Sequence, residues 1–209
     1  MHARSTLITL AAVALLALGA TAAVAQSTVP LEVSLSSGVN FLNENDTAIP
    51  DTYVGIPITG AVAYRFTTIW AAEAEFSYFC PIEKDVDLSP GVTAKRKSPD
   101  FMTYMANARA TWPLKDQPWM PYAVAGVGGI TFLSDDDEKR LPVLDESQTA
   151  FALDFGVGTG YRLTPNWVLR ADFVAFVAFP SDDADGLSSG GEADPIWMER
   201  GTVGITYRF

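Results

Sequence analysis

The sequence predicts an all-β fold, an eight-stranded antiparallel up-and-down β-barrel that crosses a membrane. Apolar residues recur at every second position in segment after segment beyond residue 26, which is the period of a strand with one apolar face. Each segment is about the ~9–11 residues that a tilted membrane-crossing strand needs. Short turns alternate with long polar connections, as they do in transmembrane barrels.

The first 25 residues are expected to be a cleaved signal peptide. Arg4 precedes an Ala/Leu-rich run from Leu7, which ends in Ala23-Val24-Ala25. A positive start, an apolar middle and a small-x-small end are the parts of a secretory signal. The alternative is an uncleaved anchor, because the run is nearly long enough to span a bilayer. We therefore expect a signal peptide at residues 1–25 and a barrel domain at residues 26–209.

The first four expected strands show the alternation directly. In the third, Glu73 and Glu75 point away from the apolar side chains around them, and in the fourth Asn107 and Arg109 do the same. The apolar faces of these four strands are Leu31, Val33, Leu35, Val39 and Phe41; Ile56, Ile58, Val62, Tyr64 and Phe66; Trp70, Ala72, Ala74, Phe76 and Tyr78; and Met102, Tyr104, Ala106, Ala108, Ala110 and Trp112.

The last four expected strands include one whose phase the sequence leaves open. The run 119–132 is rich in glycine and shows no clear alternation. The three that follow are regular, and their polar positions carry Asp154, Arg170, Asp172 and Arg200. Their apolar faces are Phe151, Leu153, Phe155, Val157 and Tyr161; Trp167, Leu169, Ala171, Phe173, Ala175 and Val177; and Trp197, Val203, Ile205, Tyr207 and Phe209.

The connections predict which end of the barrel carries long loops. Short turns are expected at Thr67-Thr68, Pro113–Pro118 and Thr164–Asn166, and the long polar segments are 42–54, 81–100, 133–148 and 180–194. A chain that starts and finishes at the turn end needs an even number of strands, and eight satisfies this condition.

A short repeat lies at the turn end. Tyr64-Arg65-Phe66-Thr67-Thr68-Ile69-Trp70 resembles Tyr161-Arg162-Leu163-Thr164-Pro165-Asn166-Trp167, and the chain ends in Tyr207-Arg208-Phe209. With Trp112 and Trp119 these residues form an expected aromatic girdle at the level of the lipid headgroups. A soluble barrel would have no reason to carry such a ring, so we interpret the barrel as transmembrane.

The negative net charge of −11 comes from the long segments between strands, and the rest of the chain after residue 25 is neutral. The four long segments hold 18 acids and six bases, whereas the rest of the chain after residue 25 has seven of each. Strand bases are all arginine, and parity points them inward with five acids, since arginine facing lipid at the midplane would cost about 2–4 kcal/mol. The expected lumen network is Glu32, Arg65, Glu73, Glu75, Arg109, Asp154, Arg162, Arg170, Asp172, Arg200 and Arg208.

Taken together, these features resemble the small outer-membrane β-barrel superfamily, whose members include the OmpA transmembrane domain, OmpX and the opacity-type surface antigens of the "porin family". The resemblance rests on the signal peptide, the eight strands, the turn Tyr161–Trp167, the strand 121–128 and the terminal Phe209. It implies that the protein lies in the outer membrane of a Gram-negative bacterium, where membrane lipid and lipopolysaccharide surround it. It also implies recognition of Phe209 and Tyr207 by the outer-membrane assembly machinery. We expect a monomer.

Enzymatic function is not expected. Barrel enzymes of similar size resemble systems that use histidine as the base, and His2 is the only histidine in this chain and would leave with the signal peptide. Glu73 and Glu75 form an acid pair, which we interpret as partners of the lumen arginines. The acidic runs at 135–138 and 182–185 are solvated loops or weak Ca²⁺ sites, and neither has EF-hand spacing. No cofactor or metal motif is found, and the acidic charge argues against a nucleic-acid partner.

The expected function is therefore a structural and surface-interaction role through acidic extracellular loops. In this interpretation, the lumen is plugged by arginine and carboxylate side chains, because an eight-stranded barrel has little room for water. An extracellular ligand would be met by the loops. The alternative is a narrow porin, or a transport barrel for small apolar ligands.

Overall fold

The computed structural model describes residues 30–43, 52–82, 84–89, 92–96, 100–134, 147–180 and 195–209. The expected signal peptide, residues 1–25, lies outside the described residues. So do most of the long acidic segments, including the acidic runs at 135–138 and 182–185. The barrel unit itself runs from Leu31 to Arg208, and Pro30 and Phe209 fall outside it.

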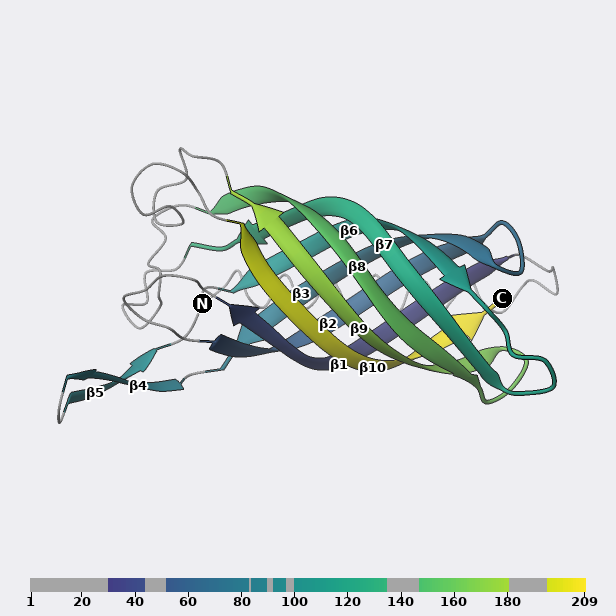
Figure 1. Ribbon diagram of the computed structural model, residues 1–209, viewed down its shortest axis with the longest axis horizontal. Coiled ribbons are helices and arrows are strands. Elements are labelled where there is room, and N and C mark those ends of the chain that lie inside the picture. The colour runs from purple at the N-terminus through teal and green to yellow at the C-terminus, as the bar shows by residue number, and fades with distance from the viewer. Residues whose placement is uncertain are drawn as a thin grey trace, which may run out of the picture. The chain divides into compact units, whose positions relative to one another are not determined.

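Eight antiparallel strands close into a barrel, which confirms the predicted fold class (Figure 1). The order around the wall is β1-β10-β9-β8-β7-β6-β3-β2, so every barrel strand is paired on both sides and the barrel has no free edge. The strands are β1 (Leu31–Asn43), β2 (Thr52–Arg65), β3 (Trp70–Pro81), β6 (Phe101–Thr111), β7 (Trp119–Phe132), β8 (Gln148–Arg162), β9 (Trp167–Phe179) and β10 (Ile196–Arg208).

Closure is made by the first and last strands. β1 pairs with β10 from Glu32↔Arg208 to Asn43↔Trp197, without a break in register. The barrel strands are 11 to 15 residues long, so all except β6 exceed the ~9–11 residues expected from the sequence. The ladders continue past the apolar stretch because the backbone hydrogen bonds of a pair do not depend on side-chain polarity.

The segment 81–100, expected to be a loop, contains a separate two-stranded sheet. β4 (Lys84–Ser89) pairs with β5 (Val92–Arg96) in antiparallel register, with an irregularity between Asp87 and Ser89. Residues of high strand propensity at Val86, Val92 and Thr93 favour this pairing. The high charge of the segment hides so short an alternation in the sequence.

The predicted short turns all lie at one end of the barrel, and the two repeat copies form the same turn. Leu163 N donates to Trp167 O at 2.9 Å, and Trp167 N donates to Thr164 Oγ1 at 3.0 Å. In the first copy, Phe66 N donates to the Trp70 carbonyl at 2.9 Å, and the Trp70 N–H donates to Thr67 Oγ1, also at 2.9 Å. The repeat is therefore a turn motif.

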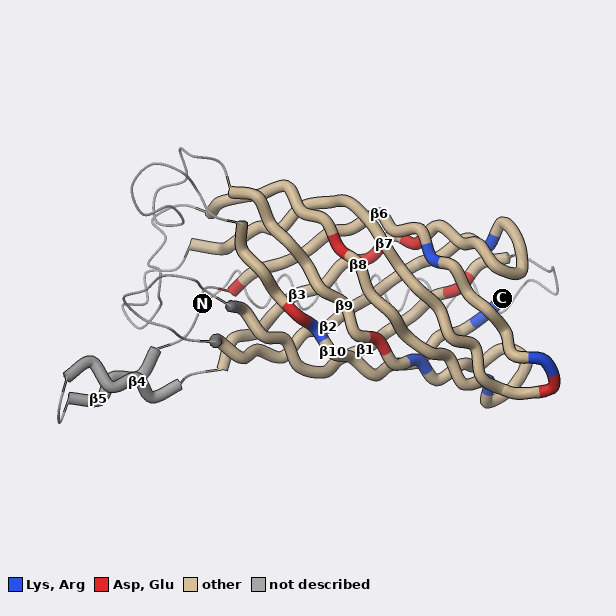
Figure 2. The backbone as a smooth tube through the Cα atoms, in the orientation of Figure 1, with Lys and Arg blue, Asp and Glu red and all other residues tan. Residues whose placement is uncertain are grey.

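The outer face of the barrel is apolar and carries two bands of aromatic side chains. The band at the turn end contains the expected residues, with Trp119 against Tyr161 and Trp167 against Tyr207 at centroid distances of 4.9 and 4.8 Å. A second band, not expected from the sequence, lies toward the loop end and includes Phe41, Tyr104, Phe151, Phe179 and Trp197. Figure 2 shows how few charged positions the described wall carries.

The barrel interior is divided into two halves of opposite character. Toward the turn end it is lined by arginines, carboxylates and hydroxyls. Toward the loop end it is filled by a buried apolar cluster, which the sequence analysis did not anticipate. This apolar half consists of Leu42, Tyr53, Phe79, Phe101, Met105, Val124, Ile130, Phe132, Ala150, Ala152, Val174, Phe176, Ala178 and Met198. Among the described residues, no helix is long and apolar enough to cross a membrane.

Candidate functional site

The ionic half of the lumen is built around Glu73, on β3. Arg109 Nη1, from the neighbouring β6, lies 2.6 Å from Glu73 Oε2. Arg170 reaches the same carboxylate from β9 with two nitrogens, at 2.8 and 3.0 Å. Glu73 is fully buried, so both charge-assisted contacts lie away from water, where such bonds are strongest.

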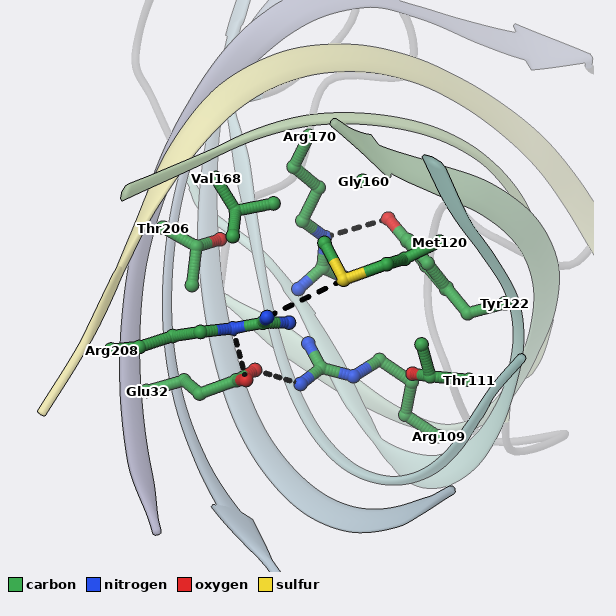
Figure 3. Close-up of a pocket in the computed structure, with 10 residues that line it drawn as sticks. All are labelled: Glu32, Arg109, Thr111, Met120, Tyr122, Gly160, Val168, Arg170, Thr206 and Arg208. Atoms are coloured by element: carbon green, nitrogen blue, oxygen red, sulfur yellow. Dashed lines mark hydrogen bonds and ion pairs between the residues drawn. The ribbon is translucent and has the colours of Figure 1, made fainter. Parts of the chain in front are cut away.

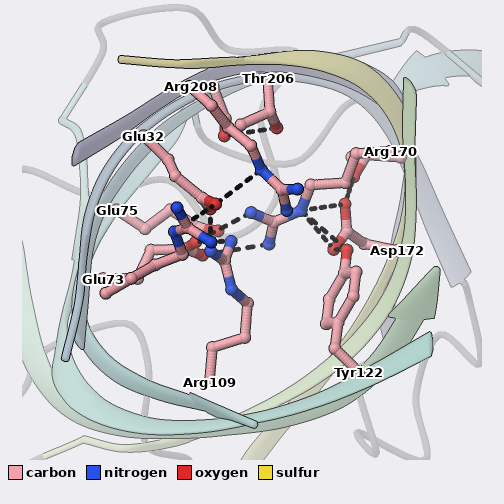
Figure 4. Close-up of polar contacts among 12 residues, drawn as sticks. Glu32, Glu73, Glu75, Arg109, Tyr122, Arg170, Asp172, Thr206 and Arg208 are labelled. Atoms are coloured by element: carbon pink, nitrogen blue, oxygen red, sulfur yellow. Dashed lines mark hydrogen bonds and ion pairs between the residues drawn. The ribbon is translucent and has the colours of Figure 1, made fainter. Parts of the chain in front are cut away.

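Glu32, on β1, extends this network toward the turn end (Figure 4). Its carboxylate contacts Arg109, Arg208 Nε at 2.8 Å and Arg65 Nε at 3.3 Å. Arg109 therefore bridges Glu32 and Glu73, and one chain of ion pairs joins β1, β2, β3, β6, β9 and β10 across the lumen.

Tyr122, on β7, is a member of the network that sequence reasoning missed. Its hydroxyl accepts a hydrogen bond from Arg170 Nε at 2.7 Å and donates one to Asp172. The Arg170 guanidinium also lies 5.0 Å from the ring centroid. The phase of β7 was open in the sequence, but an outward Trp119 in the girdle places Met120 and Tyr122 inward by parity, and this signal could have found them.

Arg200 and Glu75 form a second, deeper pair between β10 and β3. The two groups meet at 2.7 and 2.9 Å, and Arg200 also donates to Ser77 Oγ at 2.7 Å. On its other side the guanidinium lies 4.9 Å from the ring of Phe176. This pair is therefore the boundary between the ionic half and the apolar half.

Two of the eleven expected network residues stand apart. Asp154 is buried in the lumen but makes no ion pair with a described residue, and it lies beside Asn107 above Gly126. Arg162 is exposed at the turn end of β8, and its Nη2 lies 3.6 Å from Met120 Sδ. Of the other nine residues, seven belong to the chain of ion pairs around Glu73 and Glu32, and Arg200 and Glu75 form the separate pair.

The space left inside the ionic half is small. The pocket between Glu32, Arg109, Tyr122, Arg170 and Arg208 holds about 20 Å³ (Figure 3), which is room for about one water molecule. Among the described residues, no group of three or more His, Cys, Asp and Glu side chains is placed to hold a metal ion.

The apolar half closes the lumen by ring packing. Phe79 stacks on Phe101 at a centroid distance of 4.3 Å, and Phe101 meets Phe132 at 5.6 Å. All three side chains are buried inside the wall. The geometry therefore combines a charged layer and an apolar layer, one above the other.

Comparison with known proteins identifies the family. Residues 8–209 match the model of the outer membrane protein β-barrel domain. The chain belongs to the outer membrane β-barrel family. This outer membrane β-barrel is an integral protein of the Gram-negative outer membrane, so its apolar outer wall faces lipid, while the buried arginines and carboxylates of the network face the lumen.

Solved structures similar to this outer membrane β-barrel share its fold. Neisserial surface protein A (NspA) is 16% identical with a TM-score of 0.56, over 86% of this chain and 97% of that one. The N-terminal barrel domain of Pseudomonas aeruginosa OprF is 12% identical with a TM-score of 0.53, over 86% of this chain and 96% of that one. The comparison with curated proteins found no match.

Proposed function

We propose that this outer membrane β-barrel is a sealed scaffold that presents its acidic loops outside the cell, and that it acts through surface contacts rather than transport. The long-loop end faces outward in this proposal, since bacterial barrels keep their short turns in the periplasm. The ligand would be met by the loops.

One observation carries the proposal, the double closure of the lumen. An ion crossing the barrel would have to displace the bonds of Arg109 and Arg170 to Glu73 and then pass the buried rings of Phe79, Phe101 and Phe132. Desolvating an ion in such an apolar layer costs several kcal/mol. Two barriers of different chemistry support a plug better than a gated path.

The same geometry supports a non-enzymatic role. Glu73 and Glu75 are both engaged by arginine guanidinium groups, so neither carboxylate is available as a general base. A space that holds about one water molecule leaves no room for a substrate beside them.

Planar-bilayer recording of the refolded chain tests the proposal. We expect no discrete conductance steps from the wild-type barrel across a wide voltage range. The alternative, a narrow porin, predicts stable channels of uniform size, and their appearance would overturn the sealed scaffold. Uptake of small apolar molecules by reconstituted vesicles, measured in parallel, addresses the apolar-ligand alternative and should equal that of protein-free vesicles.

A further inference from the structure

The turn end of the lumen carries more arginine than its carboxylates can balance. Arg65, Arg162 and Arg208 lie at the ends of β2, β8 and β10, and we call them the basic mouth. Glu32 is the one lumen carboxylate among the described residues that contacts any of the three. Deeper in the lumen Arg109 and Arg170 are matched in number by Glu73 and Asp172, so the surplus positive charge belongs to the mouth.

The terminal nitrogens of two of these guanidinium groups have a weak protein acceptor. Arg162 Nη2 lies 3.6 Å from Met120 Sδ, and Arg208 Nη1 lies 3.4 Å from the same sulfur. A thioether is a weak acceptor, whereas a guanidinium carries five N–H donors. Within the described part of the chain, no oxygen accepts from the terminal nitrogens of either group. The two cations therefore converge on one sulfur atom with donors to spare.

The backbone holds both arginines in place. Arg208 N donates to Asn166 O at 2.8 Å, and Asn166 Nδ2 donates back to Arg208 O at 2.8 Å. Arg162 N donates to Pro118 O at 2.9 Å. The backbones of both residues are thus fixed against the short turns, so binding a ligand there would need to order only their side chains.

Two of the three side chains of the mouth are partly withdrawn from water, whereas Arg162 is exposed. Arg208 is 16% exposed and Arg65 is 36% exposed, and the small pocket behind them is lined by Arg109 and Arg170 (Figure 3). Partial burial lowers the effective dielectric constant and strengthens the attraction of an anion. The pocket has room for about one water molecule, so an anion held by the mouth would lie at the opening of the pocket, with any larger moiety further outside.

We propose that the basic mouth binds a phosphate group, with Arg162 and Arg208 donating from two sides and Arg65 adding charge. The planar fork of arginine matches the oxygens of phosphate, and a phosphate would supply the oxygen acceptors that Met120 does not. The phosphate comes either from a free anion or from a lipid headgroup at the periplasmic face. This site is independent of the surface role proposed above.

Equilibrium dialysis of radiolabelled inorganic phosphate against the barrel, refolded in an uncharged maltoside detergent at low salt, tests the site. We expect saturable binding of one phosphate per barrel. Arg162→Gln and Arg208→Gln should each weaken binding about tenfold, the loss of a charge-assisted hydrogen bond. Lys115→Gln removes the same charge from an exposed position in the β6–β7 turn and should leave binding unchanged.

A lipid arm separates the two sources of phosphate. Phosphatidylglycerol added to the micelles should displace the label if the mouth accepts headgroups, and a phosphate-free galactolipid should not. If phosphatidylglycerol does not compete, the site takes the free anion. Absence of saturable binding, or equal weakening by Lys115→Gln and Arg162→Gln, would overturn the proposal. Arg162 is exposed, so its variant should fold even if Arg208→Gln does not, and heat-dependent gel mobility checks this.

Discussion

Glu73 holds two arginine side chains, each of which also contacts a second carboxylate, Arg109 that of Glu32 and Arg170 that of Asp172. Arg109 and Arg170 reach it from β6 and β9 at 2.6 and 2.8 Å. A complete buried ion pair adds little to the stability of a protein. Removing one partner, however, leaves an uncompensated buried charge, which is strongly destabilising. Single substitutions in the ionic half should therefore have large effects.

Replacing Glu73 by Ala, or Arg170 by Ala, should lower the free energy of unfolding of the barrel by about 3–5 kcal/mol, the cost of breaking a buried ion pair. Membrane insertion should persist, because the outer apolar face is unchanged. The measurement is the temperature to which samples must be heated before electrophoresis for the folded band to be replaced by the unfolded band. Lys115→Ala, at an exposed turn position, is the control. Unchanged heat resistance in both lumen variants would contradict the network.

Gly126 provides a test of packing in the lumen. A Cβ at this position would collide with the side chains of Asn107 and Asp154 and with the Ala106 carbonyl, whereas a Cβ at Gly60 would meet nothing within 4 Å. Gly126→Ala should therefore destabilise the fold by about 1–3 kcal/mol through overpacking. Gly60→Ala should be neutral within error. Urea unfolding in detergent, followed by tryptophan fluorescence, compares the two variants.

At the scale of elements, the turn motif explains why the same seven-residue pattern occurs twice. Each copy uses its threonine hydroxyl to accept a hydrogen bond from the backbone of the tryptophan that starts the next strand. The tryptophan ring then lies in the girdle, so one short segment both reverses the chain and sets its depth in the membrane.

Thr164→Val should slow folding and lower stability by about 1 kcal/mol, since it removes the acceptor for Trp167 N at nearly constant volume. The second copy offers a replicate in Thr67→Val. Thr159→Val, on the outward face of β8, is the matched control and should not destabilise in lipid. The rate of appearance of the folded band during refolding into vesicles is the readout. A Thr164→Val rate equal to that of Thr159→Val would show that the hydroxyl is dispensable.

The eight barrel strands and three short turns could be predicted because each follows from local alternation and turn composition. Contacts across the lumen could not, since the stagger between strands decides whether Arg109 meets Glu73 or Glu75, and parity specifies only the face. The apolar half was missed for a related reason. Leu42, Phe79 and Phe132 lie on the lumen face near the loop end, where apolar side chains occupy both faces of a strand.

For the whole molecule, closure depends on pairing the first and last strands. β1 and β10 are the first and last strands of the barrel, and their ladder forms only after the strands between them have been made. Late, long-range pairing of this kind is slow, which gives the C-terminal strand a special place in assembly.

Deleting Phe209, or replacing Tyr207 by Ala, should lower the amount of folded protein in the outer membrane of cells, if these residues form the expected assembly signal. Refolding of the same variants into detergent should be much less affected, because no machinery is involved. Quantitative blotting of membrane fractions against refolding yield measures the difference. Normal outer-membrane levels of both variants would argue against the signal.

The cross-lumen network has a consequence for how the barrel selects its alignment. A slip of two residues between neighbouring strands leaves every apolar side chain facing lipid, so the hydrophobic pattern alone does not penalise it. Such a slip would, however, separate Arg109 from Glu73 or Arg200 from Glu75. It would leave these buried charges without a partner, which is costly. The buried ion pairs thus favour the native register over shifted registers, even though a shifted barrel would present the same apolar outer face to the membrane.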